Sequence, residues 1–410
     1  MRIALFCHSL LSDWNHGNAH FLRGVVGELI ARRHEVLVFE PREAWSVQNL
    51  VAERGETALE ATREVYPFLR VRRYDLAELA TENALDHALE GTALLLVHEW
   101  NDPALIALLG AYRARHPATR ALFHDTHHRA VTNPGAMARY DLSAYDGVLA
   151  FGAIIRDLYL ARRWARAAFV WHEAADTRVF RPQEDILKER DLVWIGNFGD
   201  GERTAELETF LLRPIRDLGL SARLYGVRYP EPVLARLAAS GVDYRGFLPN
   251  YRAPDAFARA RLTVHVPRRP YVESLPGIPT IRPFEALACG IPLVSSPWHD
   301  TEGLFTEGRD YLVARDGDEM KRALRDLLAE PAMAREIAGH GLMTVLTHHT
   351  CAHRVAELLR LVGELGLDVT TPLETKGSRE TPIPTPIPTP IPTPIPTPAP
   401  TPIPGTLRAT

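Results

Sequence analysis

Short apolar runs alternate with longer amphipathic stretches along most of the chain. Residues 3–7, 93–97 and 291–294 are continuous apolar runs, and residues 17–32 are an amphipathic stretch that directly follows the first loop. Uninterrupted apolar runs of this length are typical of strands buried on both faces of a parallel sheet, with the amphipathic stretches supplying the covering helices. The pattern therefore predicts an α/β protein built from repeated strand–helix units.

The alternation occurs in two series, which predict two Rossmann-like domains. The first series covers residues 1–176, and the second covers residues 191–346. Predicted strands lie at 3–7, 34–39, 93–97, 120–123, 147–151 and 169–172, and then at 192–195, 223–225, 243–247, 262–266, 291–294 and 311–313. A length of 410 residues exceeds one comfortable core, which also favours two domains.

Three further segments complete the predicted organisation. Residues 46–88 are interpreted as mostly helical, and residues 177–190 have the proline and charge content of an interdomain linker. Residues 347–367 are predicted to form a final helix that crosses back to the first domain.

The composition changes abruptly near residue 368. Thr-Pro-Ile-Pro repeats from 381 to 404, and such regular proline predicts an extended, unpacked polyproline II tail over residues 368–410. A passive linker or tail is the favoured interpretation. A docking element for a proline-recognising partner is the alternative.

Charge, cysteine content and hydropathy exclude several classes of protein. A net charge of −4 argues against a general nucleic-acid binder. Three scattered cysteines do not suggest a disulfide framework and favour a reducing compartment, so we expect a cytoplasmic location. No apolar run reaches the roughly 18 residues of a membrane-spanning helix, so any membrane contact is expected to be peripheral.

Polar clusters follow the predicted strands of the first domain. His124 and Asp125 follow one such strand, within a histidine-rich run at residues 124–128. Open parallel sheets bind ligands beyond the carboxyl ends of their strands, so this run is interpreted as substrate-contacting rather than metal-binding. Asp316 and Asp318 directly precede a predicted helix and are interpreted as capping residues, so no metal site is assigned.

Residues 282–295 form the most informative stretch, a short helix followed by a buried strand. Glu285 is its single carboxylate, and the Pro/Gly-rich loop at 275–280 precedes it. Glu285 either complements the positive end of the helix or accepts from sugar hydroxyls while free N–H groups at the helix start bind phosphate. The second interpretation predicts a nucleotide-sugar pocket that includes Thr280, Arg282 and Glu285.

A second candidate ligand loop lies between the first strand and helix of the second domain. Its glycines at 196, 199 and 201 do not match the dinucleotide-binding order Gly-x-Gly-x-x-Gly. We interpret it as a phosphate-facing loop that contains Gly196 and Asn197. Arg203 at its end is either a surface arginine or the charge-assisted contact to a pyrophosphate.

These residues carry a family resemblance. Residues 282–290, Arg-Pro-Phe-Glu-Ala-Leu-Ala-Cys-Gly, resemble the signature of the CgeB-like (spore maturation protein-like) glycosyltransferases, relatives of retaining glycosyltransferase family 4. Further matches lie at 196–197 with 203, at 223–226, at 302–305 and at 348–354. The similarity covers residues 192–365 well. It implies a GT-B fold, in which two Rossmann-like domains face each other across a cleft and the C-terminal domain holds most of the nucleotide sugar.

The resemblance also implies roles for single residues. Glu285 matches the glutamate that holds the donor ribose hydroxyls, and Arg203 resembles the basic residue near the diphosphate. Gly17, with the adjacent Asn18, matches the first loop that approaches the donor phosphates. His124 and Asp125 resemble a pair near the donor sugar or acceptor, which makes them catalytic candidates.

One position departs from the family pattern, since Gly277 replaces a glutamate that contacts the transferred sugar in the wider family. The leading hypothesis is a hexosyltransferase-like glycosyltransferase that uses a nucleoside diphosphate sugar and an unidentified acceptor, retains the anomeric configuration and needs no metal or other cofactor. A nucleotide-sugar epimerase or hydrolase on the same fold is the first alternative. A non-catalytic nucleotide-sugar-binding protein that docks through its tail is the second.

Overall fold

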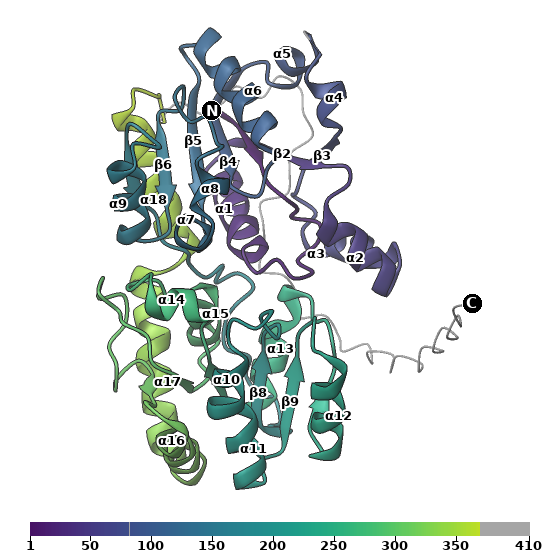
Figure 1. Ribbon diagram of the computed structural model, residues 1–410, viewed down its shortest axis with the longest axis vertical. Coiled ribbons are helices and arrows are strands. Elements are labelled where there is room, and N and C mark those ends of the chain that lie inside the picture. Colours follow the sequence, from purple (N-terminus) through teal and green to yellow (C-terminus); the bar gives the residue numbers. More distant parts are fainter. Residues whose placement is uncertain (82, 370–410) are drawn as a thin grey trace, which may run out of the picture.

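Two parallel β-sheets, each with its own helices, lie at opposite ends of the long axis of the molecule (Figure 1). The computed structural model describes residues 1–81 and 83–369. The N-terminal sheet occupies the upper half of the view and the C-terminal sheet the lower half. The predicted α/β architecture of two Rossmann-like domains is confirmed. From residue 370 onward, the predicted polyproline tail falls outside the described residues.

The N-terminal sheet has the strand order β3-β2-β1-β4-β5-β6-β7, and all of its recorded pairings are parallel. Its strands are β1 Arg2–Phe6, β2 Glu35–Pro41, β3 Val71–Tyr74, β4 Thr92–His98, β5 Arg120–Asp125, β6 Gly147–Ala150 and β7 Ala168–Val170. Its helices are α1 Ala19–Ala31, α2 Trp45–Arg54, α3 Thr57–Val65, α4 Leu76–Leu79, α5 Ala84–Ala88, α6 Pro103–Arg115, α7 Arg129–Thr132, α8 Pro134–Met137 and α9 Ala153–Ala161.

The C-terminal sheet has the order β10-β9-β8-β11-β12-β13 and is also parallel. Its strands are β8 Arg190–Ile195, β9 Ala222–Tyr225, β10 Asp243–Tyr244, β11 Ala260–His265, β12 Leu293–Ser295 and β13 Leu312–Val313. Its helices are α10 Thr204–Leu207, α11 Arg213–Leu218, α12 Glu231–Ala239, α13 Ala253–Ala258, α14 Arg269–Glu273, α15 Ile281–Ala288, α16 Gly317–Ala329 and α17 Pro331–His348, with a π-helical turn at Glu208–Leu212 and a 3-10 turn at Asn250–Arg252.

The chain passes between the domains twice, and the two passages lie side by side. Ala175 in the first passage and Thr350 in the second form an isolated parallel bridge. Thr350 also caps α18 (Cys351–Glu364) by accepting from the His353 amide, which ends the second passage. Helix α18 then packs on α1 of the N-terminal domain, where Trp171 Nε1 donates to the Arg354 carbonyl at 2.8 Å.

The interpretation of residues 46–88 as mostly helical is wrong at one place, because β3 lies within it. Its four residues, Val71-Arg72-Arg73-Tyr74, are half-buried or exposed. They form the edge of the sheet beside β2. An edge strand needs no apolar run, and charged side chains at an edge discourage further pairing. The apolar pattern therefore could not reveal it.

The α1–α18 contact depends on a glycine, which gives a test of how the domains are joined. A Cβ atom at Gly24 would lie 2.8 Å from Asp176 Cβ and would clash with Cys351 Sγ. We expect Gly24→Ala to lower the free energy of unfolding by about 1–3 kcal/mol through overpacking, measured by chemical denaturation. Gly339→Ala, at an exposed position inside α17 with open space around it, is the control and should be neutral or stabilising. Equal stability of both variants would contradict the packing described here.

Candidate functional site

A cleft of about 790 Å³ lies between the two domains. One wall comes from the loop after β1 and from the residues that follow β4 and β5. The opposite wall comes from the residues that follow β8 and β11 and from the start of α15. The carboxyl ends of both parallel sheets therefore face one shared space, where α/β sheets bind their ligands.

Three basic side chains on the C-terminal wall, Arg203, Arg268 and Arg282, form what we call the arginine cluster. Arg203 donates to the Val266 carbonyl at 2.7 Å and to the Asn197 carbonyl, and its guanidinium lies over the Trp194 ring. Its buried Nε has no hydrogen-bond partner. Burial, followed by the nearby Arg268, lowers the pKa of Arg203 to about 10, and no carboxylate of the described residues forms a salt bridge with it.

The positive charges of the other two members, Arg268 and Arg282, are only partly compensated by nearby carboxylates. Arg268 donates to Glu202 at 3.0 Å, and Arg282 pairs with Glu285. His265 lies beside them, with its Nδ1 hydrogen-bonded to Ser295 Oγ at 2.9 Å and its Nε2 without a partner. Burial, followed by the neighbouring arginines, lowers the pKa of His265 to about 3. This wall therefore offers positive charge and unused polar atoms to an anion.

The backbone at the start of α15 adds to this anion site. Thr280 precedes the helix with a φ of 61°, an uncommon conformation for a β-branched residue, and it lines the cleft together with Arg282. The first N–H groups of a helix have no intrahelical partners and attract anions. The predicted residues Thr280 and Arg282 thus lie at the cleft with Arg203.

Glu285, for which the resemblance implies a ribose contact, lies behind Arg282 and not at the surface of the cleft. Its side chain is fully buried and does not line the cleft. One carboxylate oxygen lies 2.8 Å from His20 Nδ1 of α1, and the other contacts Arg282. His20 Nε2 accepts from the Asp176 amide, so Nδ1 carries the proton that is donated to Glu285. Glu285 thus joins the two domains and holds Arg282, and its contact with a ribose stays a prediction.

The predicted loop residues lie together where the domains meet. Gly17, Asn18, Gly196 and Asn197 all line the cleft. The Asn197 side chain donates to Asn15 of the N-terminal domain and accepts from the Val227 amide at 2.9 Å. A hydrogen bond across the cleft therefore connects the two candidate phosphate-facing loops.

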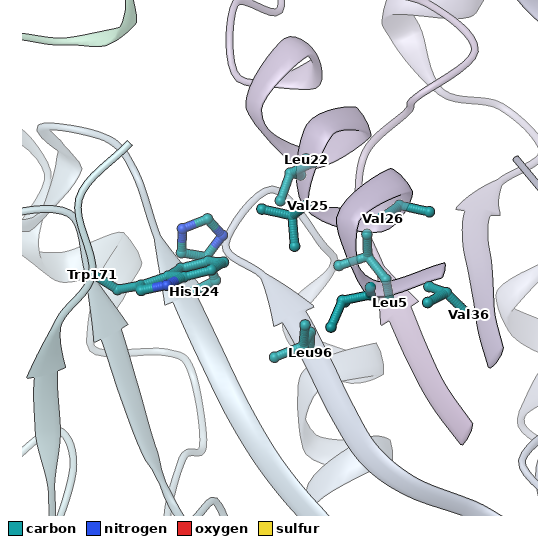
Figure 2. A pocket seen from close by; sticks show the side chains of 9 residues that line it. Leu5, Leu22, Val25, Val26, Val36, Leu96, His124 and Trp171 are labelled. Carbon is teal, nitrogen blue, oxygen red and sulfur yellow. The ribbon is translucent and has the colours of Figure 1, made fainter. Parts of the chain in front are cut away.

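The prediction that His124 and Asp125 act in the cleft is not supported, because both lie in the core of the N-terminal domain. Strand β5 extends through Asp125 instead of ending at residue 123. His124 stands beside Trp171 and faces apolar side chains around a small internal cavity (Figure 2). Asp125 is fully buried and accepts from the Tyr159 hydroxyl at 2.8 Å. The next residues, Thr126, His127 and His128, line the cleft instead.

Burial sets the protonation of this pair. It lowers the pKa of His124 to about 3. It raises the pKa of Asp125 well above its ordinary value, and the nearby Glu99 adds to the increase. Burial therefore disfavours the charged form of both groups, which suits a buried structural role.

Several cleft residues were not identified from the sequence. Arg268 precedes α14, and Glu173 lies in the first passage between the domains. Trp100 lies under the guanidinium of Arg129, 4.1 Å from its ring centre. Only the position of Trp100, two residues after the end of β4, could have indicated from the sequence that it lies at the cleft. Glu173 and Arg268 lie in segments without a recognisable ligand-binding pattern.

The described residues contain no group of three or more His, Cys, Asp or Glu side chains placed to hold a metal ion. Asp316 accepts from the amides of Asp318 and Glu319, which confirms its interpretation as a helix cap. Over the same described part of the chain, no helix has both the length and the hydropathy needed to cross a membrane.

Comparisons with known proteins agree with the fold of two Rossmann-like domains. Residues 203–360 match a family model described as glycosyl transferase-like. The whole fold is similar to sucrose-phosphate synthase from Thermosynechococcus elongatus, with a TM-score of 0.62, 16% identity, and coverage of 89% of this chain and 99% of that one. It is also similar to HepE of Anabaena in complex with UDP, with a TM-score of 0.63, 12% identity, and coverage of 89% and 100%.

A third similar structure is an alpha-glucosyltransferase in complex with UDP and a 13-mer DNA, with a TM-score of 0.63, 11% identity, and coverage of 88% and 99%. No curated protein sequence matches the chain. At these identities the similarities show the fold, which is the GT-B fold of glycosyltransferases. The CgeB-like subtype stays a prediction.

The buried position of Glu285 leads to a prediction about stability. Glu285→Ala would leave Arg282 without its carboxylate and His20 without its acceptor, at a contact between the two domains. Because breaking a buried pair leaves the remaining group uncompensated, we expect the free energy of unfolding to fall by about 3 kcal/mol, measured by chemical denaturation. Glu273→Ala removes a side chain that is 65% exposed and should change stability by less than about 0.5 kcal/mol. If both variants unfold alike, Glu285 does not join the domains.

Proposed function

We propose that this protein is a glycosyltransferase that moves a hexose from a nucleoside diphosphate sugar to the hydroxyl group of an acceptor. The single observation that carries the proposal is the arginine cluster, whose positive charge faces a cleft between two Rossmann-like domains. Its member Arg203 is half-buried, and within the described residues its hydrogen bonds go only to main-chain carbonyl groups. A diphosphate is an anion of suitable charge and size for such a site.

The chemistry of sugar transfer gives this cluster a role. When the bond between the sugar and the diphosphate breaks, negative charge develops on the leaving phosphate. Fixed positive groups that are already oriented toward this phosphate stabilise the charge more than bulk solvent would. Arg203, Arg268 and Arg282 would hold the diphosphate, with the amides at the start of α15. On the resemblance of residues 282–290 to the glycosyltransferase signature, we propose a metal-independent reaction.

The similar proteins support the choice of donor. HepE structures were obtained with UDP and with UDP-glucose, and the alpha-glucosyltransferase structure contains UDP. UDP-glucose is therefore the first donor to test. Retention of the anomeric configuration is proposed on the resemblance of residues 282–290 to retaining enzymes. Under this proposal, Glu285 supports the donor site by holding Arg282 in place.

The proposal predicts which arginines matter for the donor. A ligand that binds only the native state raises the thermal midpoint, so UDP, UDP-glucose, GDP-mannose, ADP-glucose and dTDP-glucose should be screened by thermal shift. At least one should stabilise the wild type. Arg203→Gln and Arg268→Gln should each weaken the binding of that compound about tenfold or more by calorimetry, since each removes a charge-assisted contact. Arg213→Gln, on the exposed start of α11, is the control and should bind as the wild type does.

Two outcomes would contradict the proposal. If no nucleotide stabilises the protein, or if the three arginine variants bind equally, the cleft is not a diphosphate site. If the donor is consumed completely without an acceptor, the epimerase or hydrolase alternative replaces the transferase. An intact donor without acceptor, with a new glycoside formed once an acceptor is supplied, is the expected result.

A further inference from the structure

Glu173 differs from every other carboxylic acid that lines the cleft. Within the described residues, Asp13, Asp200 and Glu202 each have an arginine nitrogen within hydrogen-bonding range, at 2.7, 3.1 and 3.0 Å respectively. Glu173 has no basic partner for its carboxyl group. A buried carboxyl group without a cation is costly when ionised, so the neutral, protonated form of Glu173 is favoured.

The hydrogen bond that Glu173 makes fixes the orientation of its carboxyl group. The side chain of Asn18, at the start of α1, donates Nδ2 to Glu173 Oε1 at 2.7 Å. Glu173 itself is only 6% exposed. Because Oε1 accepts from an amide, a proton on this carboxyl group belongs on Oε2. Oε2 makes no hydrogen bond to the part of the chain that the structure describes.

The charged groups around Glu173 disfavour its ionised form. Glu285 of α15 and Glu99, which follows β4, repel a negative charge here. Arg354 of α18 is near, but its Nε donates to the Glu173 main-chain oxygen at 3.4 Å and its Nη1 pairs with Glu357. Tyr271 of α14 is also within electrostatic range and is neutral. Burial and then the two carboxylates raise the pKa of Glu173 to about 8.

Glu173 lines the same cleft as the arginine cluster, on the opposite wall, where the sugar of the proposed donor would lie. Asn18 follows Gly17, where an added Cβ atom would lie 3.5 Å from Ile281 at the start of α15. Arg282 is the next residue of that helix. Asn18 and Glu173 therefore line the N-terminal wall of the cleft, and Arg282 lines the C-terminal wall of the same cleft. A bound diphosphate on the arginine cluster would favour the neutral form of Glu173 further.

We propose that Glu173 acts as a neutral carboxylic acid, with Oε2–H donating a hydrogen bond to a hydroxyl oxygen of the transferred sugar. This inference rests on the proposed function, because it requires a donor sugar beside the arginine cluster. Asn18 is the positioning residue that keeps Oε1 as the acceptor. The role differs from that of a general base, which would have to be ionised to remove a proton from the acceptor.

The first test needs no ligand. The folded-state pKa of Glu173 lies above the ordinary value of 4.5, so its stabilising contribution is present below that value and is lost as the pH rises to about 8. Glu173→Gln cannot ionise and escapes this loss. Its thermal midpoint relative to the wild type should therefore increase between about pH 5 and pH 8 and then level off.

Glu184→Gln makes the same chemical change at an exposed position of the same interdomain segment. Its midpoint relative to the wild type should not vary with pH. If the Glu173→Gln difference is equally independent of pH, Glu173 is already ionised at neutral pH, and the inference is overturned.

The second test compares each nucleoside diphosphate sugar of the panel with its own nucleoside diphosphate by calorimetry, beginning with UDP-glucose and UDP. In the wild type at about pH 7, the sugar should improve binding by about tenfold, and most of this advantage should disappear at about pH 9.5. Glu173→Gln should keep the advantage at both pH values, because its amide also donates. Glu173→Ala should lack it at both, and Glu184→Gln should match the wild type.

The outcomes separate this inference from the proposed function. If UDP and the other nucleotides do not bind to the wild type, the proposed function fails, while the pH dependence of stability still tests the protonation of Glu173. If nucleotides bind but no sugar adds affinity, or if Glu173→Gln loses the advantage as Glu173→Ala does, the inference is overturned. The last result would mean that Glu173 works as an anion.

Discussion

Like charge gathered in one cleft is the physical constraint on which the rest of this structure depends. Arg203, Arg268 and Arg282 repel one another, and all three are half-buried, which reduces the screening of their charges by water. Glu202 and Glu285 compensate two of the three. Within the described residues Arg203 forms hydrogen bonds only to carbonyl groups, and its Nε forms none, so its charge remains available to an anion. The start of α15 lines the same cleft, and the first N–H groups of a helix attract anions.

Compensation of this charge also connects the domains. Glu285 neutralises Arg282 on the cleft side and accepts from His20 of α1 on the other. Glu173, in the passage between the domains, differs from the arginine cluster, since no cation of the described residues pairs with its carboxyl group and burial raises its pKa to about 8. The cleft therefore combines a cationic wall with a neutral hydrogen-bond donor. This division suits a ligand with an anionic part and a hydroxyl-bearing part.

The fold was largely predictable because parallel strands buried on both faces leave continuous apolar runs. The two series of strand–helix units were identified on that basis, and both appear as parallel sheets. The predicted strands are wrong where a strand is only partly buried, or where a proline changes the residue at which a strand begins. The edge strand β3 is charged, and β12 begins at Leu293 rather than 291, since Pro292 cannot donate to a ladder hydrogen bond.

The candidate site was less predictable, because sequence position does not tell which side of a strand end a residue faces. Arg203, Thr280 and Arg282 were placed near the ligand by local motifs, and they line the cleft. His124 and Asp125 were placed there by their position at a predicted strand end and by the family resemblance, but β5 continues through both. Glu173 gained its importance from a partner 155 residues away. The most direct test of the central claim is a crystal structure of the protein with UDP-glucose. The account predicts that the diphosphate oxygens lie within hydrogen-bond distance of Arg203 and at least one other member of the arginine cluster. A nucleotide bound elsewhere, with the arginine cluster unliganded, would contradict it.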